Sequence, residues 1–291
     1  MTPARRGASG FARRAAVAIA ATCVAVPTTP SQAQDPPAWT RPTAPVHLLG
    51  PIWYVGTEGL ASYLIKTSAG AIVIDGTLAE NVPAIRRNIE AAGVPIVRVK
   101  WLLLTHAHFD HAAGMAGLQR ASGAKLAVGA RDAAAVRTGT PPGETSYGVI
   151  RLPPARVDRA VRDGEVIRLG NVALRAVATP GHTPGCTTWT MRVAERGRTL
   201  DVVFPCSVSV AGNRLFANRR YPDIATDYRA SFARLAVLPA DVVLDSHPER
   251  ADVLERARTG RLVAPGLLRE IVLKARDEFD RELLRQGRTA R

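Results

Sequence analysis

Short apolar segments separated by turn residues follow one another along the first half of the chain. Their length and composition predict strands at 52–55, 61–67, 71–75, 99–104 and 125–128. Apolar residues spaced three or four positions apart predict helices at 78–92, 112–121 and 131–137. This half of the chain is therefore expected to form a sheet with helices beside it.

The second half repeats the theme. Strands are expected at 165–169, 172–179, 187–194, 200–204 and 241–244, with tight turns at Gly170-Asn171 and Arg196-Gly197. Helices are expected at 226–238 and, apart from Pro265-Gly266, from about Glu249 onward. Two strand-rich halves with accompanying helices and no linker predict one domain of the α/β (α+β) class. Its expected architecture is an αββα sandwich, with two facing sheets and helices outside.

The segment 139–156 interrupts this pattern with four Pro and three Gly residues and no periodicity. A loop of this length in a compact domain is often a flap over a binding site. An ordinary surface excursion fits the same composition, and the sequence does not decide between them.

The first residues have the pattern of an export signal. Four arginines (Arg5, Arg6, Arg13 and Arg14) precede an apolar stretch at 15–26, and Ser31 and Ala33 supply small residues for cleavage. The apolar stretch is too short for a transmembrane helix. We therefore expect a signal peptide at 1–33, a single mature domain at 34–291, and a periplasmic protein with no membrane attachment after cleavage.

The chain is basic, with a formal charge of +14 that falls to +10 once the four arginines of the signal are removed. Nucleic-acid binding is one explanation of such a charge. However, the arginines are scattered rather than interleaved with aromatic residues in a basic run, so no nucleic-acid partner is expected. The charge instead favours anionic substrates or merely solvates the surface. The expected partner is a small-molecule substrate, and the protein is expected to be a monomer.

The candidate chemistry is concentrated in one turn. His106, His108, Asp110 and His111 lie within six residues, directly after the buried strand at 99–104. The chain has only six histidines, and three of them are here. Imidazoles with one carboxylate suit zinc, and a strand-to-helix turn is a usual place for catalytic groups.

Two further histidines complete this set. His182 and His247 each follow a predicted strand and are flanked by Pro, Gly or Ser residues. The remaining histidine, His47, lies in an apolar stretch and is expected to be structural. Five His and one Asp suffice for two Zn²⁺ ions with three protein ligands each, which leaves open positions typical of a catalytic site. Such a site predicts a hydrolase, because zinc supplies hydroxide at neutral pH.

The segments HAHFDH at 106–111, GHTPG at 181–185 and SHP at 246–248 resemble the metallo-β-lactamase superfamily, and more finely its subclass B3. Supporting stretches lie at 53–60, 74–76 and 185–190, and the resemblance runs from about Trp39 to about Leu284. It implies the metallo-β-lactamase fold. Most other hydrolases of the superfamily, such as glyoxalase II, carry a bridging Asp after the strand that here ends at Phe204. This chain has Pro205-Cys206-Ser207 there instead.

The resemblance also implies a role for each residue of the site. The first zinc would be held by His106, His108 and His182, and the second by Asp110, His111 and His247. Asp110 would also orient the hydroxide, while Ser207 and Ser209 would hydrogen-bond water and the substrate carboxylate.

The two mature cysteines, Cys186 and Cys206, lie beside the proposed site. A disulfide is possible in an oxidising compartment, and a related subclass uses a Cys in this region as a zinc ligand. Because the six-ligand set is already complete, we expect both to be free, small and buried, with Cys206 pointing into the core.

The implied activity is hydrolysis of the β-lactam amide in penicillins, cephalosporins and carbapenems, which confers antibiotic resistance. Trp39, Tyr147 and Ile150 are expected to face the substrate from their positions in the chain. One alternative is another dinuclear zinc hydrolase of this fold, acting on a lactone, thioester or phosphodiester. A second is an exported zinc-binding protein without catalysis, which would need closed coordination.

Overall fold

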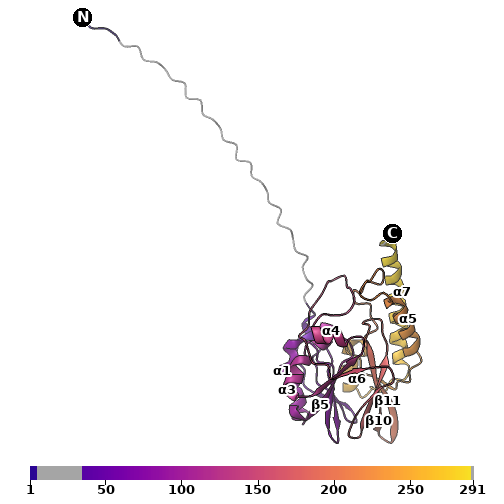
Figure 1. The fold of residues 1–291 in the computed structure, drawn as a ribbon. Helices are drawn as coiled ribbons and strands as arrows, with labels where there is room; N and C mark the ends of the chain where they lie inside the picture. The colour runs from indigo at the N-terminus through magenta and orange to yellow at the C-terminus, as the bar shows by residue number, and fades with distance from the viewer. Residues whose placement is uncertain (5–34, 290–291) are drawn as a thin grey trace. The chain divides into compact units, whose positions relative to one another are not determined.

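Two β-sheets pack face to face, and helices lie outside them (Figure 1). The structure, a computed structural model, describes residues 1–4 and 35–289. The expected signal cleavage site lies outside these residues and stays a prediction. Among the described helices, none is both long and apolar enough to cross a membrane. The two layers of sheet between helices confirm the expected αββα sandwich.

The first sheet contains seven strands in the order of the sequence. They are β1 (Val46–Leu49), β2 (Ile52–Tyr54), β3 (Tyr63–Thr67), β4 (Gly70–Ile74), β5 (Val99–Leu103), β6 (Lys125–Gly129) and β7 (Arg159–Val161). The pairs from β1 to β4 are antiparallel, and those from β4 to β7 are parallel. The carboxyl ends of the parallel strands meet at one edge, which is where α/β folds place their sites.

The second sheet contains five strands in the order β12-β11-β10-β9-β8. They are β8 (Val166–Leu169), β9 (Val172–Ala178), β10 (Thr187–Glu195), β11 (Arg198–Phe204) and β12 (Val242–Val243). All pairs are antiparallel except β11 with β12. Because β11 and β12 run in the same direction, the residues that follow them emerge at the same end of the sheet.

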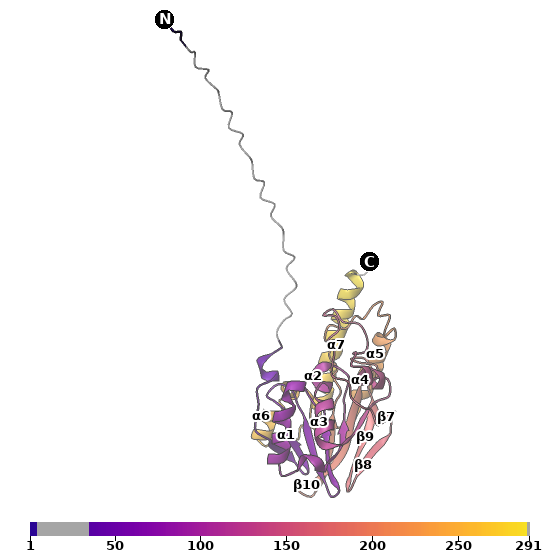
Figure 2. The ribbon, with the colours of Figure 1, turned by 60° about the vertical axis from the view of Figure 1, so that its left-hand side comes forward.

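The helices form the outer layers. They are α1 (Val82–Ala91), α2 (Phe109–Ala112), α3 (Met115–Ser122), α4 (Ala133–Thr138), α5 (Ile224–Leu235), α6 (Val253–Arg258) and α7 (Leu267–Thr289). Short 3₁₀ turns cover Pro37–Trp39, Ala79–Asn81, Ile96–Arg98 and Pro248–Ala251. Helices α1 and α3 lie on one side of the sandwich and α5 and α7 on the other (Figure 1), while Figure 2 shows α2 beside the upper end of α3.

The alternating pattern of the strands explains this layering. In β3, for example, Tyr63 and Ile65 belong to the core between the sheets, whereas Leu64 belongs to the cluster that also contains Ile85 and Ile89 of α1. Both faces of this strand are therefore buried from Tyr63 to Ile65, as the apolar run of these three residues indicates. The indole of Trp189 on β10 is fully buried between the sheets, where Nε1 donates to the Leu104 carbonyl at 3.1 Å.

Two strands, β1 and β7, are absent from the prediction made from sequence. They are the two edges of the first sheet, and each is only partly buried. Edge strands are often short and expose half of their side chains, so they carry little of the apolar pattern that reveals a central strand. The long segment 139–156 is a loop as expected, without helix or strand.

The expectation that Cys186 and Cys206 are free is wrong. The structure joins them in a disulfide, with Cα atoms 5.7 Å apart. Cys186 begins the approach to β10, and Cys206 follows β11, so that two neighbouring strands of the second sheet bring them together. Sequence spacing did not reveal the bond because it depends on the pairing of these strands.

A buried carboxylate connects the two sheets near the same end. Asp132 accepts hydrogen bonds from the Ala107 nitrogen at 2.9 Å, the Thr183 hydroxyl at 2.6 Å and the Gly185 nitrogen at 2.7 Å. A Cβ at Gly185 would collide with the backbone of Asp132, so this close approach requires glycine. Asp132 therefore holds the loop that carries His182 against the turn that carries His106 and His108.

Replacing both cysteines by alanine is expected to lower the free energy of unfolding by about 3 kcal/mol, because the unfolded chain loses a cross-link across 20 positions. Urea denaturation measures this difference. Reduction should bring the unmodified protein down to the stability of the variant and leave the variant unchanged. Peptide mapping that finds both thiols free in the non-reduced protein would contradict the disulfide.

Substitution Asp132→Ala is expected to cost about 3 kcal/mol or more, because it leaves buried donors of two loops without an acceptor. The matched control is Asp277→Ala on the exposed face of α7, expected to change stability by less than about 0.5 kcal/mol. An equal urea midpoint for the two variants would show that other contacts hold the loops.

Candidate metal centre

Three loops at one end of the sandwich carry the six predicted ligands. The turn after β5 leads through His106 and His108 into α2, which contains Asp110 and His111. His182 lies between β9 and β10, and His247 follows β12. All six side chains are buried. The structure therefore brings together every residue that the sequence proposed as a ligand, from segments up to 141 positions apart.

His106, His108 and His182 form the first triad. Nδ1 of His108 lies 2.9 Å from Nε2 of His182, and the ring of His106 lies 4.6 Å from that of His182 between centroids. One ligand atom from each of the three lies within 4.8 Å of the others. Three imidazoles converging on one point are a usual zinc site with an open fourth position.

Asp110, His111 and His247 form the second triad. Asp110 Oδ2 lies 3.1 Å from His111 Nε2 and 3.3 Å from His247 Nε2, and the two nitrogens are 3.2 Å apart. Ligands about 2.0 to 2.1 Å from a tetrahedral zinc are separated by roughly 3.3 Å. The three atoms thus have the spacing of one face of such a site. The triads adjoin, since the rings of His106 and His111 are 4.2 Å apart.

The hydrogen bonds of His106 test whether a cation fits. The Thr105 hydroxyl donates to Asp75 Oδ2 at 2.7 Å, so the 3.1 Å contact to His106 Nδ1 requires that the imidazole donate. Nε2 therefore carries a lone pair, yet it is buried and has no hydrogen-bond partner among the described residues. A buried acceptor on a ring that lies beside two other imidazoles is what a metal ion would satisfy. The donor set fits a pair of such ions.

The electrostatics of the first triad also suit a cation. Burial lowers the pKa of His106 well below its ordinary value, and His111, His182 and His108 lower it further. Burial likewise lowers the pKa of His108 to about 4, although Asp110 opposes the shift. Both rings are consequently neutral at pH 7, which is the protonation state that a metal ligand needs.

The second triad is a coupled acid–base pair. Burial alone would raise the pKa of Asp110, but His111 and His247 outweigh it and hold that pKa well below its ordinary value. Burial would lower the pKa of His111, but Asp110 and Asp75 raise it to about 10. The second triad therefore holds an ionised carboxylate and a protonated imidazole when no metal ion displaces the proton.

Asp75 orients both triads, a role that the sequence did not reveal. It follows β4 with a positive φ of 59°, and its carboxylate accepts from the Thr105 nitrogen at 2.8 Å and the Thr105 hydroxyl. Its Oδ2 also lies 3.4 Å from Nδ1 of His111. A carboxylate behind a ligating imidazole fixes the orientation of the ring. In the sequence, Asp75 is an acid at the end of a buried strand and lies in the stretch 74–76 that supports the family resemblance, but neither signal assigns it this role.

Ser207 and Ser209 lie beside His182. The backbone oxygen of Ser209 accepts from His182 Nδ1 and from the Tyr228 hydroxyl, both at 2.7 Å. The two serine hydroxyls are 3.1 Å apart, and each accepts a hydrogen bond from a guanidinium nitrogen of Arg250. His182 therefore presents Nε2 to the triad, since its other nitrogen is engaged. Sequence reasoning did not include Tyr228 or Arg250 in the site.

The residues expected to face a substrate lie around the same end. Trp39 packs against His247 and Phe109, with ring centroids 5.7 Å and 6.2 Å away. Tyr147 and Ile150 of the long loop line a cavity together with His108. His47 lies outside the cluster, where Nε2 contacts the Gly50 carbonyl at 2.9 Å and the ring packs on Trp53, as expected for a structural histidine.

Comparisons with solved structures agree with this geometry. The chain is similar to BJP-1, a subclass B3 metallo-beta-lactamase of Bradyrhizobium japonicum, with a TM-score of 0.83 and 35% identity over 88% of this chain and 99% of that one. It is also similar to the FEZ-1 metallo-beta-lactamase of Legionella gormanii, with a TM-score of 0.80 and 33% identity over 85% of this chain and 98% of that one.

The curated proteins that are similar in sequence are enzymes with activities other than that of a β-lactamase. A hydroxyacylglutathione hydrolase of Acidiphilium cryptum is 31% identical over 217 residues, which are 73% of this chain and 69% of the relative. The human mitochondrial persulfide dioxygenase ETHE1 is 28% identical over 68% of each chain. These relatives share the fold and show that sequence similarity alone leaves the substrate open.

The family model of the metallo-beta-lactamase superfamily matches residues 56–247, a span that begins before Asp75 and ends at the last histidine of the second triad. This span contains all six predicted ligands and is most of the described sandwich. The chain therefore belongs to the metallo-β-lactamase superfamily, as a metal-dependent hydrolase whose structural neighbours are subclass B3 enzymes.

Proposed function

We propose that this protein hydrolyses the amide bond of β-lactam antibiotics and thereby confers resistance to them. The observation that carries the proposal is the end of strand β11. After Phe204 the chain continues with Pro205, the disulfide-bonded Cys206 and Ser207, so no carboxylate is available there to bridge two metals. The second triad is complete without one, because His247 takes part in it.

Two zinc ions are the proposed cofactors, one held by His106, His108 and His182 and the other by Asp110, His111 and His247. When bound, zinc supplies hydroxide at neutral pH and polarises the carbonyl group that is attacked. The convergence of the three histidines of the first triad, the 3.1 to 3.3 Å spacing of the second and the neutral imidazoles of the first support this assignment.

The chain's own groups prepare the attack. Asp110, held ionised by His111 and His247, would accept a hydrogen bond from the attacking water or hydroxide and so orient it. Ser207 and Ser209 offer hydroxyls to the carboxylate that all three β-lactam classes carry beside the ring nitrogen. Trp39 and Tyr147 provide apolar walls that limit access of water. No serine acts as a nucleophile in this scheme, so no acyl-enzyme forms.

We further propose that the protein is exported to the periplasm, after removal of a signal peptide, and acts there as a monomer. The disulfide between Cys186 and Cys206 supports export, since such bonds persist in oxidising compartments. The periplasm is also where β-lactams reach their targets.

A thioester hydrolase is the second candidate. It is favoured by the hydroxyacylglutathione hydrolase relatives, one of which matches over 69% of its length. Its weakness is the missing carboxylate after β11. A thioester substrate would have to be attacked at a dinuclear site assembled without that bridge.

Zinc-loaded protein is expected to hydrolyse nitrocefin and imipenem faster than S-D-lactoylglutathione, and EDTA should abolish the turnover.

His182→Ala should lower kcat/KM by about 100-fold or more, because it removes a ligand of the first triad. The control is His47→Ala, which changes a histidine outside the site and should leave kcat/KM within about twofold. Zinc content and melting temperature of both variants are measured alongside.

Faster turnover of lactoylglutathione than of both β-lactams would refute the proposed substrate and favour the thioester hydrolase. Equal losses in His47→Ala and His182→Ala would show that the measured loss is not specific to the site.

Zinc binding is expected to be pH-dependent at the second triad only. His111, with a pKa of about 10, carries a proton at pH 7 that zinc must displace, so affinity there should rise about tenfold per pH unit below pH 10. The histidines of the first triad are already neutral, with a pKa of about 4 for His108, and affinity should be flat above about pH 5. Titration calorimetry in buffers of different ionisation enthalpy measures the released proton.

The matched variant is His111→Ala. It should lose the pH-dependent binding of zinc at the second triad and still bind one zinc ion at the first triad with unchanged affinity. Proton release of the same size at both sites would contradict the assignment of charge to His111.

A further inference from the structure

Arg250 reaches the metal centre from the turn that follows His247. Its Nη1 donates to the Ser207 hydroxyl at 2.9 Å and its Nη2 to the Ser209 hydroxyl at 3.4 Å. The side chain is half-buried, and it extends from the loop of the second triad to the serines beside the first. The guanidinium therefore links the loop of His247 to the segment that follows β11.

The charge of Arg250 is not neutralised by the protein. Within residues 35–289, no Asp or Glu oxygen lies within 4.0 Å of its guanidinium nitrogens. The neighbouring Glu249 turns instead toward His247 Nδ1, at 3.7 Å. An arginine at this depth with only two neutral hydroxyls for partners is unusual, because guanidinium groups in protein sites commonly pair with carboxylates.

We propose that Arg250 is a specificity-determining residue, which binds the carboxylate of the substrate together with Ser207 and Ser209. This inference rests on the proposed β-lactam hydrolysis and assigns its anionic substrate group a charged partner. Arginine suits the task because its planar N–H groups bind both oxygens of a carboxylate. Ser207 and Ser209 alone would offer neutral donors, which bind an anion more weakly.

The geometry also explains why the serines are close together. The two hydroxyls are 3.1 Å apart, and both accept hydrogen bonds from one guanidinium. One hydroxyl donates to the other, so the row keeps one O–H group and the remaining N–H groups of Arg250 as donors for an anion. A carboxylate that docks on this row replaces water rather than a protein partner, so no ion pair has to be broken. Removal of the charge should therefore weaken substrate binding more than it slows the chemical step.

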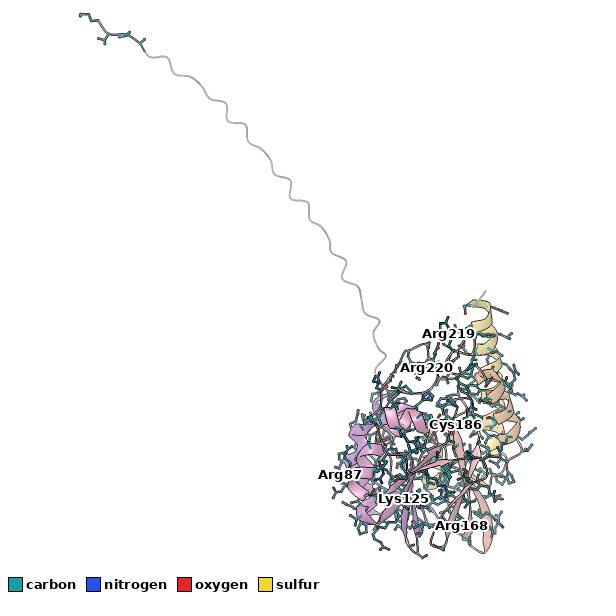
Figure 3. The ribbon with its side chains drawn as sticks, viewed as in Figure 1. Arg87, Lys125, Arg168, Cys186, Arg219 and Arg220 are labelled. Carbon is teal, nitrogen blue, oxygen red and sulfur yellow. A yellow bond between two sulfur atoms is a disulfide. The ribbon has the colours of Figure 1, made fainter. Side chains whose placement is uncertain are left out.

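The test compares Arg250→Gln and Arg250→Lys with the unmodified zinc enzyme, on nitrocefin and on its methyl ester. Arg250→Gln should raise KM for the acid by about 10- to 100-fold, with kcat within about threefold, and leave KM for the ester within about twofold. Arg250→Lys should bind the acid more tightly than Arg250→Gln, because lysine keeps the positive charge but lacks the planar pair of N–H groups that binds both carboxylate oxygens. The control is Arg168→Gln on strand β8, far from Cys186 in Figure 3, which removes the same charge from an exposed position.

Equal changes for acid and ester, or loss of bound zinc in Arg250→Gln, would overturn the proposal and show that Arg250 only supports the loop. An unchanged KM for the acid would overturn it as well, while leaving the β-lactamase activity intact. If the unmodified enzyme turns over lactoylglutathione but no β-lactam, the proposed function fails by itself. Arg250 is then judged on the KM for that dicarboxylate, where a rise in Arg250→Gln, but not in Arg168→Gln, supports it and no rise overturns it.

Discussion

The buried carboxylate of Asp132 is the contact on which the metal centre depends, because the ligands come from loops of two different sheets. Each sheet alone presents histidines at its end, but three imidazoles reach one point only if the loops are held in register. Asp132 does this with hydrogen bonds to Ala107 on one loop and to Thr183 and Gly185 on the other. Burial raises the pKa of this carboxyl, and the three donors counteract the shift. The disulfide between Cys186 and Cys206 restrains the same loop from its other side.

A second level of organisation concerns charge. Asp75 contacts Thr105 and His111, so that a single carboxylate fixes the tautomer of His106 through the threonine and lies beside His111 directly. The result is an uneven pair of triads, with neutral imidazoles in the first and an ion pair in the second. The second triad thus contains a proton where a metal ion would sit, whereas the first contains an unsatisfied lone pair on His106. The two triads therefore start from different protonation states before any cation binds.

The sequence predicted the layers, the central strands and the six candidate ligands that the fold brings together, because these depend largely on local patterns. The central strands of the first sheet contain apolar runs, such as 71–74 and 101–103, and the histidines at 106, 108 and 111 lie within six residues. What it did not predict depends on partners distant in the chain. The edge strands β1 and β7 lack an apolar pattern, and the disulfide requires β10 to pair with β11. Asp132 and Arg250 look like ordinary surface residues until the fold places Gly185 and Ser207 beside them.

The solved structures and the curated relatives point to different substrates, and the residues after β11 bear on this difference. Sequence similarity to hydroxyacylglutathione hydrolases extends over much of the chain because the shared motifs hold the metals and the sandwich, which serve any substrate. Residues outside those motifs are the ones that would contact the substrate and select it. Here Ser207 and Ser209 follow β11 with neutral hydroxyls, and Arg250 of the turn after His247 adds one positive charge beside them, with which a carboxylate after β11 would pair. The arginine and the missing acid are therefore two parts of one arrangement, which leaves the cation available to an anionic substrate.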